Sequence, residues 1–149
     1  MRQRACAIVL SGNRFMFMKQ MVDGRLWRVF VGGGIEYGET AEQAVIRELG
    51  EEANVEGKII YGPVLIQTEH HIEHIFIIDI GDEIPTFGFD PELPLDKQDL
   101  KGIEFIDFTK EREVFNIYDM KYVSAILDDA KQQGINSIWL DKLKSTSLT

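Results

Sequence analysis

The chain has 149 residues and is 44% hydrophobic, which is enough for one domain with a substantial core and excludes a disordered chain. Its formal net charge of -9 argues against a broad basic surface for duplex nucleic acid, and no apolar run approaches the roughly 20 residues of a membrane-spanning helix. A single cysteine, Cys6, excludes an internal disulfide and a zinc held by a cysteine cluster, and its apolar neighbours predict a small buried side chain.

The first part of the chain predicts β-structure. The basic start and short apolar run of MRQRACAIVLSGNRF are too short for a convincing signal peptide, so we expect a first strand and a cytoplasmic protein. The run ACAIVL, the turn SGN and the alternating segment RFMFMKQ together predict a hairpin. The next segment, LWRVFV (Leu26–Val31), predicts another strand.

A helix is predicted from Thr40 to Ala53, after three consecutive glycines that predict a flexible hinge. Thr40 suits the N-cap, and Gln43 three residues later completes a capping-box pattern. Asn54 stands where a helix often ends in a left-handed residue, a place for which Asn is the best substitute for Gly. The apolar side expected to pack on a sheet consists of Val45, Ile46, Leu49 and Ala53.

The second half of the chain predicts further strands and a second helix. KIIYGPVLIQTEHHIEHIFIIDI predicts two or three strands, broken near Gly62 and Pro63, and GDEIPTFGFDPELPLDKQD predicts a long loop. GIEFIDF predicts a late strand, VFNIYDMKYVSAILDDAKQQG predicts an amphipathic helix that stops at Gly134, and residues 144–149 predict a frayed tail. We therefore expect a single α/β (α+β) domain over residues 1–149, with a mixed sheet packed between helices.

The first helix carries a crowded acidic face. Glu48, Glu51 and Glu52 are spaced at i, i+3 and i+4, so their carboxylates share one side and repel one another. Partial protonation, the neighbouring Arg47 or a bound cation can offset this repulsion. Hard carboxylate oxygens suit Mg²⁺ or Mn²⁺, and these ions bind phosphate oxygens. Because the preceding glycines admit a close ligand, the pattern indicates a phosphate-handling site, although a solvated acidic face is the commoner use of such residues.

The spacing of these residues favours a phosphate-handling site over a solvated acidic face. The pattern is Gly33, five residues, Glu39, seven residues, Arg47-Glu48-Leu49, one residue, Glu51-Glu52, one residue, Asn54-Val55. It resembles the Nudix box, GX5EX7REUXEEXGU with U aliphatic, at every specified position except the last glycine, where Asn54 stands. The chain therefore resembles MutT-type Nudix hydrolases. The resemblance implies an α/β/α sandwich with a mixed central sheet, and hydrolysis of a nucleoside diphosphate linked to another group, with Mg²⁺ or Mn²⁺ as cofactor.

The resemblance also implies roles for individual residues. Glu48, Glu51 and Glu52 would bind metal, together with the backbone carbonyl of Gly32, and either Glu48 or Glu51 would serve as general base. Arg47 and Glu39 would orient the carboxylates through ion pairs. Other candidates for an acid near the metal are Asp96, Asp99 and Glu104. The residues expected to bind substrate are Gly32, Gly33, Gly34 and Tyr37, and Phe115 and Tyr118 are further candidates for base stacking, whereas Trp27 suits a core position at least as well.

The segment HHIEH contains a second motif. His70, Glu73 and His74 match the H-x-x-E-H pattern of some zinc peptidases, a chemistry that needs a helix. The residues that follow, IFIIDI, predict a strand, on which His70 and His74 share a face and Glu73 points away. We therefore expect either side chains that line a substrate cleft or a polar strand end, with the zinc peptidase as a remote alternative.

The function predicted from the sequence is cleavage of a nucleotide pyrophosphate bond, with a nucleoside triphosphate as the first candidate substrate. The alternative is a nucleotide-binding or regulatory module without turnover, against which the intact Arg47-Glu48 and Glu51-Glu52 pairs argue. The expected partner is a small-molecule nucleotide, with neither duplex nucleic acid nor membrane, and we expect a monomer or a homodimer.

Overall fold

The computed structural model describes residues 1–88, 100–107 and 117–144. The strands are β1 Arg2–Ser11, β2 Arg14–Val22, β3 Arg25–Val29, β4 Val31–Gly34, β5 Lys58–Gln67, β6 His71–Asp79 and β7 Leu100–Asp107. The helices are α1 Ala41–Ala53, α2 Ile117–Gln132 and α3 Ile138–Lys144. Within these ranges, no helix is long and apolar enough to cross a bilayer.

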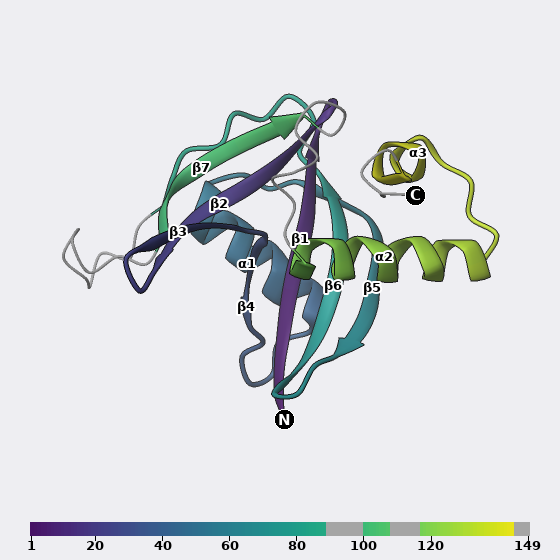
Figure 1. Ribbon diagram of the computed structural model, residues 1–149, viewed down its shortest axis with the longest axis horizontal. Coiled ribbons are helices and arrows are strands. Elements are labelled where there is room, and N and C mark those ends of the chain that lie inside the picture. The colour runs from purple at the N-terminus through teal and green to yellow at the C-terminus, as the bar shows by residue number, and fades with distance from the viewer. Residues whose placement is uncertain (89–99, 108–116, 145–149) are drawn as a thin grey trace.

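The strands form one seven-stranded mixed sheet in which β1 is central. One edge of β1 pairs in parallel with β6 along its length, and β5 continues the sheet beyond β6 in antiparallel orientation. The other edge of β1 is shared: residues 4–7 pair with β4, and residues 9–11 pair with β2. Because β2 also pairs with β3 and β7, the sheet divides at β1 into a short branch and a longer one (Figure 1).

Helices cover both faces of the sheet, which confirms the predicted α/β/α arrangement. Figure 1 shows α1 behind the sheet and α2 on the opposite side, near β5 and β6. Alternation along β1 supplies both cores, since residues 5, 7 and 9 pack with α1 while residues 6, 8 and 10 pack with α2 and α3. The buried residues of α1 are Ala44, Val45, Leu49 and Ala53.

Most predicted elements are confirmed, with five differences. The glycines predicted as a hinge form β4, and the strand predicted over Leu26–Val31 is divided at Phe30 between β3 and β4. Gly62 and Pro63 do not end a strand, because β5 absorbs them as a register shift in its pairing with β6. Ile46 is 37% exposed and lies outside the buried face of α1. The sequence analysis did not predict α3, and the predicted frayed tail lies largely outside the described residues.

Candidate active site

The two ends of α1 are fixed by the residues predicted to cap it. The Thr40 side chain accepts a hydrogen bond from the backbone N–H of Gln43, and the Gln43 side chain accepts one from the N–H of Thr40, which confirms the capping box. Asn54 adopts a left-handed conformation with φ 58° and donates its N–H to the Gly50 carbonyl. The acidic face of α1 is therefore carried by a helix with defined first and last turns.

The last turn of α1 is also tied to the chain that follows β6. The N–H groups of Thr86 and Gly88 donate to the carbonyl oxygens of Ala53 and Glu52, each at 2.9 Å. A Cβ at residue 88 would overlap the carbonyl oxygen of Glu51, so this close pairing requires glycine. These hydrogen bonds satisfy carbonyl oxygens of the last helical turn that would otherwise lack a partner. They also hold the backbone of Glu51 and Glu52 in place.

Arg47 connects the acids of the motif. Its guanidinium forms a two-point ion pair with Glu39, with N–O distances of 2.8 and 3.0 Å. It also donates to Glu48 at 2.9 Å, to Glu51 at 3.4 Å and to the backbone carbonyl of Gly34 at 3.0 Å. The bond to Arg47 is the main reason that the pKa of Glu39 falls to about 2, and the bond to Glu39 raises the pKa of Arg47. One guanidinium thus links the helix to β4.

Glu48 and Glu52 have the opposite electrostatic character. Burial raises the pKa of Glu48, against the lowering effect of Arg47. Burial is also the largest cause that raises the pKa of Glu52 to about 8, followed by the charge of Glu48, while the N–H of Gly32 acts in the opposite direction. Within the described part of the chain, the buried Oε2 atom of Glu52 has no hydrogen-bond partner. The Oε2 atom of this carboxylate therefore lacks a hydrogen-bond donor that would compensate its burial.

These residues fit a divalent cation by the chemistry of their donors. An unpartnered buried carboxylate oxygen beside further carboxylates offers the hard ligands that Mg²⁺ and Mn²⁺ prefer. Among the described residues, no group of three Asp, Glu, His or Cys side chains could hold a metal ion as placed. Arg47 contacts both Glu48 and Glu51, so these carboxylates have a positive partner in the structure.

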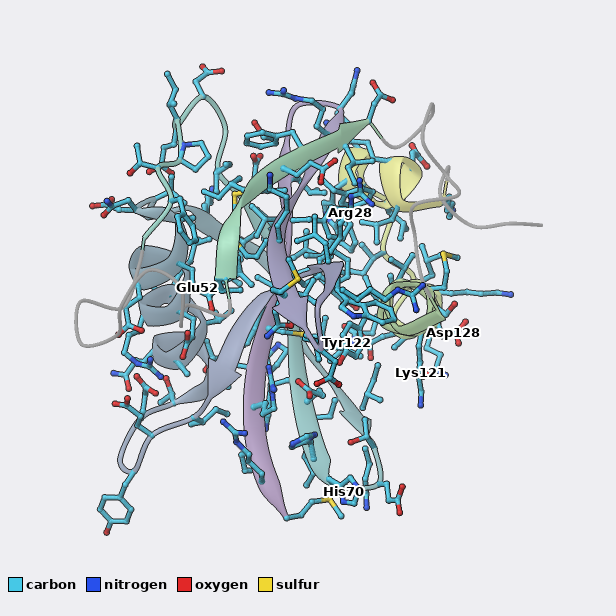
Figure 2. The ribbon with its side chains drawn as sticks, turned by 60° about the vertical axis from the view of Figure 1, so that its left-hand side comes forward. Arg28, Glu52, His70, Lys121, Tyr122 and Asp128 are labelled. Atoms are coloured by element: carbon cyan, nitrogen blue, oxygen red, sulfur yellow. The ribbon has the colours of Figure 1, made fainter. Side chains whose placement is uncertain are left out.

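A cavity of about 900 Å³ opens where the sheet divides. Its lining includes Glu52 and Gly32, so it reaches the acidic site. Figure 2 shows Glu52 on the α1 side and Tyr122 on the α2 side, with His70 at the far end of the strands. The aromatic residues of the lining are Trp27, Phe30, Tyr122 and the two histidines His70 and His71. The volume and lining suit a mononucleotide-sized ligand.

Several candidates from the sequence lie away from this cavity or outside the described residues. Tyr37 is fully exposed and does not line the cavity. Glu104 forms a two-point ion pair with Arg28, at 2.9 and 3.0 Å, so its carboxylate has a cationic partner. The segments 89–99 and 108–116, which contain Asp96, Asp99 and Phe115, lie outside the described residues, as does the side chain of Tyr118. By contrast, Trp27 is 36% exposed and lines the cavity.

The HHIEH segment does not have the geometry of a zinc peptidase. His71–Asp79 form a strand, as predicted, and His70 lies in the bend before it. His74 bonds to the Gln3 side chain at 2.7 Å, on the face opposite Glu73. A peptidase site needs both histidines and the glutamate around one ion, so this alternative is wrong.

Arg4 and its contact with Glu73 were not predicted from the sequence. The Arg4 Nε and Glu73 Oε1 atoms are 3.4 Å apart, and both residues line the cavity. A signal was present, because Arg4 occupies the same strand face as Cys6 and Ile8, where an apolar residue is the usual choice. Glu73 was considered only as part of the histidine motif.

The chain is similar to known proteins both in sequence and in fold. The family model described as NUDIX domain matches residues 1–124. Among solved structures, a NUDIX-family hydrolase from Clostridium perfringens has a TM-score of 0.64 at 16% identity, over 84% of this chain and 93% of that one. An Ap4A hydrolase from C. elegans has a TM-score of 0.61 at 13% identity, over 87% and 99% of the two chains. These structures support the fold alone.

One curated relative is closer in sequence but matches a short segment. It is the RNA pyrophosphohydrolase of Sphingopyxis alaskensis, 43% identical over 61 residues, which are 38% of this chain and 38% of the relative. The match thus spans less than two fifths of either protein.

Proposed function

This chain belongs to the NUDIX domain family, and from that membership we propose that it is a metal-dependent pyrophosphohydrolase of nucleotides. The first candidate substrate is a nucleoside triphosphate, cleaved by water to a nucleoside monophosphate and pyrophosphate. The observation that carries this proposal is the buried Oε2 atom of Glu52, which has no hydrogen-bond partner among the described residues; Glu52 lies with Gly32 in the lining of a nucleotide-sized cavity. A buried carboxylate oxygen without a hydrogen-bond partner beside such a cavity favours a cation that bridges protein and phosphate.

The proposed chemistry assigns a task to each part of the site. Glu48, Glu51, Glu52 and the carbonyl of Gly32 would hold Mg²⁺ or Mn²⁺. When bound, such a cation supplies positive charge that polarises phosphoryl oxygens and makes water easier to deprotonate. Glu48 and Glu51 remain the two candidates for the base that takes the proton from the attacking water.

The remaining residues of the motif would orient this base. Arg47 keeps Glu48 and Glu51 in fixed directions, and its two-point bond to Glu39 fixes Arg47 in turn. The bond from Arg47 to the Gly34 carbonyl ties this ion-pair network to β4, so α1 and β4 keep a fixed position relative to each other. A base held in this way loses little orientational freedom when substrate binds.

A second candidate substrate is the triphosphorylated 5′ end of an RNA. It is favoured by the 43% identity with the RNA pyrophosphohydrolase over 61 residues. The net charge of -9 argues against it, because a long polyanion gains affinity mainly from basic surface. The bond cleaved would be the same in both cases.

The test is a substrate panel with identified products. The protein is incubated with the four nucleoside triphosphates, an ADP-sugar, a dinucleoside polyphosphate and a 5′-triphosphorylated RNA, with Mg²⁺, with Mn²⁺ or with a chelator. We expect metal-dependent release of a monophosphate and pyrophosphate from at least one triphosphate. Binding without turnover of any compound would favour the regulatory module instead.

A further inference from the structure

Arg4 lies beside the backbone of the proposed metal site. In the antiparallel pairing of β1 with β4, Cys6 is opposite Gly32 and Arg4 is opposite Gly34. Arg4 and Cys6 share one face of β1, and both line the cavity together with Gly32 and Glu52. A phosphate chain bound along β4 from Gly32 towards Gly34 would therefore pass Arg4, which lies two residues from Cys6 on the same face of β1.

Glu73 holds Arg4 from the other side. The two residues are direct partners in the parallel pairing of β1 with β6, and their Nε and Oε1 atoms are 3.4 Å apart. The side chain of Glu73 is 5% exposed and that of Arg4 is 30% exposed, so the pair is anchored at the glutamate and reaches the cavity at the arginine. A mostly buried ion pair is costly to desolvate and often weaker than an apolar pair of the same size.

The pair is also incompletely satisfied. Among the described residues, neither Arg4 Nε nor Glu73 Oε2 has a hydrogen-bond partner. Buried polar atoms of this kind are uncommon and call for an explanation. Because such a pair contributes little to stability, a functional role of the Arg4 cation explains its presence better.

The other cationic side chains of the lining are placed differently. Arg28 is committed to Glu104 through two hydrogen bonds, and Lys121 is an exposed residue of α2 (Figure 2). Arg4 is the lining cation on the strand that pairs with β4, where its backbone lies opposite Gly34. It is therefore the lining cation that comes from a strand paired with the backbone of the proposed metal site.

We propose that Arg4 binds a phosphate group of the substrate next to the acidic site, and that Glu73 is the residue that positions Arg4. This inference rests on the proposed function and adds a residue outside the glutamate motif. A guanidinium matches two phosphate oxygens at once and keeps its charge at any working pH. It would stabilise the negative charge that grows on the phosphoryl oxygens as water attacks.

The first experiment compares Arg4→Gln and Arg4→Lys with Arg14→Gln. Arg14 stacks on Phe105 at the far end of β2, so its loss changes the net charge equally but not the cavity. For Arg4→Gln we expect kcat/KM to fall by about 10²-fold or more. The factor should be the same for every nucleoside triphosphate that the unaltered protein cleaves. Arg4→Lys should recover part of this loss, because it keeps the charge without the planar fork. Arg14→Gln should stay within about twofold of the unaltered protein.

A second variant guards against simple unfolding. Arg4→Gln removes the arginine partner of the buried Glu73 charge and leaves His71 Nδ1, at 4.0 Å, as its remaining ion-pair neighbour, which is destabilising, so the double variant Arg4→Gln/Glu73→Gln is made as well. It removes both charges at nearly constant volume and should be folded yet as defective as Arg4→Gln. Glu73→Gln alone should raise KM and lower kcat by smaller factors, with partial rescue in Glu73→Asp if the carboxylate acts by positioning.

Direct binding separates this inference from the proposed function. Pyrophosphate is titrated into each variant with and without Mg²⁺, and we expect the folded double variant to bind at least about tenfold more weakly than the Arg14→Gln control. If the protein cleaves nothing but this difference is present, the inference stands and the hydrolase proposal fails. Equal binding and turnover in the double variant and the Arg14→Gln control would overturn the inference. A loss that depends on the identity of the base would also overturn it, since the contact would then be to the base.

Discussion

The carboxylate of Glu48 lies directly against the Cα atom of Gly33, so that a Cβ at residue 33 would overlap its Oε1 and Cδ atoms. Gly33 is not a hinge, because it belongs to β4 and pairs with Ala5 of β1. The glycine is needed for space: the acid of the helix fills the volume that a side chain of the strand would occupy. This contact explains why a glycine is required at residue 33.

Gly33→Ala is expected to displace Glu48 and reduce turnover. The added methyl group must push the carboxylate away from Arg47 or shift β4, so we expect kcat to fall by at least about tenfold, since small misplacements of catalytic groups are costly. The control is Gly50→Ala, in α1, where a Cβ meets no atom within 4 Å. That change should raise stability by about 0.5–1 kcal/mol through helix propensity and leave kcat unchanged. Steady-state kinetics and thermal unfolding of both variants provide the measurement, and equal kcat values would contradict the steric argument.

Glu52→Gln is expected to separate catalysis from folding. We expect turnover to fall by about 10²-fold or more, because a buried anionic ligand is lost. The metal-free protein should keep its thermal stability, since an amide replaces a buried acid whose Oε2 atom has no partner. Unaltered protein should be stabilised by Mg²⁺ in thermal unfolding, and the variant should respond much less. Glu42→Gln, an exposed acid in the first turn of α1, is the matched control. A folded Glu52→Gln protein with near-normal turnover would sink the metal assignment.

The ion pair between Glu39 and Arg47 predicts a pH dependence of stability. The folded pKa of Glu39 is about 2, below its ordinary value of 4.5, so between these limits the unfolded chain binds more protons than the folded one. The stabilising contribution is therefore complete above pH 4.5 and is lost as the pH falls towards 2. Denaturant unfolding at pH 5, 4 and 3 should show a smaller loss of stability in Glu39→Gln than in the unaltered protein. Parallel pH profiles would show that the pair contributes nothing.

Asn54 tests the single departure from the sequence motif. Its φ of 58° is left-handed, so Asn54→Ala should cost about 1–2 kcal/mol of the free energy of unfolding. Asn54→Gly relieves the backbone but removes the hydrogen bond from Nδ2 to the Thr86 side chain, and these effects should nearly cancel. Chemical denaturation of the two variants measures the difference. Equal stabilities would mean that the backbone conformation at this residue is not what favours Asn.

The local features of the fold were predictable because local residues determine them. Thr40, Gln43 and Asn54 specify the two ends of α1 through contacts a few residues apart, and the structure agrees. The apolar runs near the start of the chain likewise predict the first two strands, which are buried on both faces over residues 5–10 and 15–18. The failures involve partners far apart in the chain. The glycines of β4 have low strand propensity, and they form a strand because β1 offers them an edge.

The same distinction holds at the site. The motif residues are within one turn of helix or one loop of one another, so their meeting could be predicted. Arg4 and Glu73 meet only because β1 and β6 pair in parallel, a pairing that no local pattern specifies. Tyr37 shows that closeness in sequence does not ensure closeness in space. It follows the glycines closely, yet its side chain is directed into solvent.

The division of the sheet at β1 has a consequence for how such a protein can change over generations. The acids and their arginine depend on α1 and on a strand that is mostly glycine backbone, whereas the opposite wall of the cavity comes from β3 and the start of α2. Mutations in that wall can change the shape of the cavity while the proposed metal site keeps its geometry. The architecture therefore allows the two halves of the cavity to diverge separately, and divergent relatives should differ first at Trp27 and Tyr122.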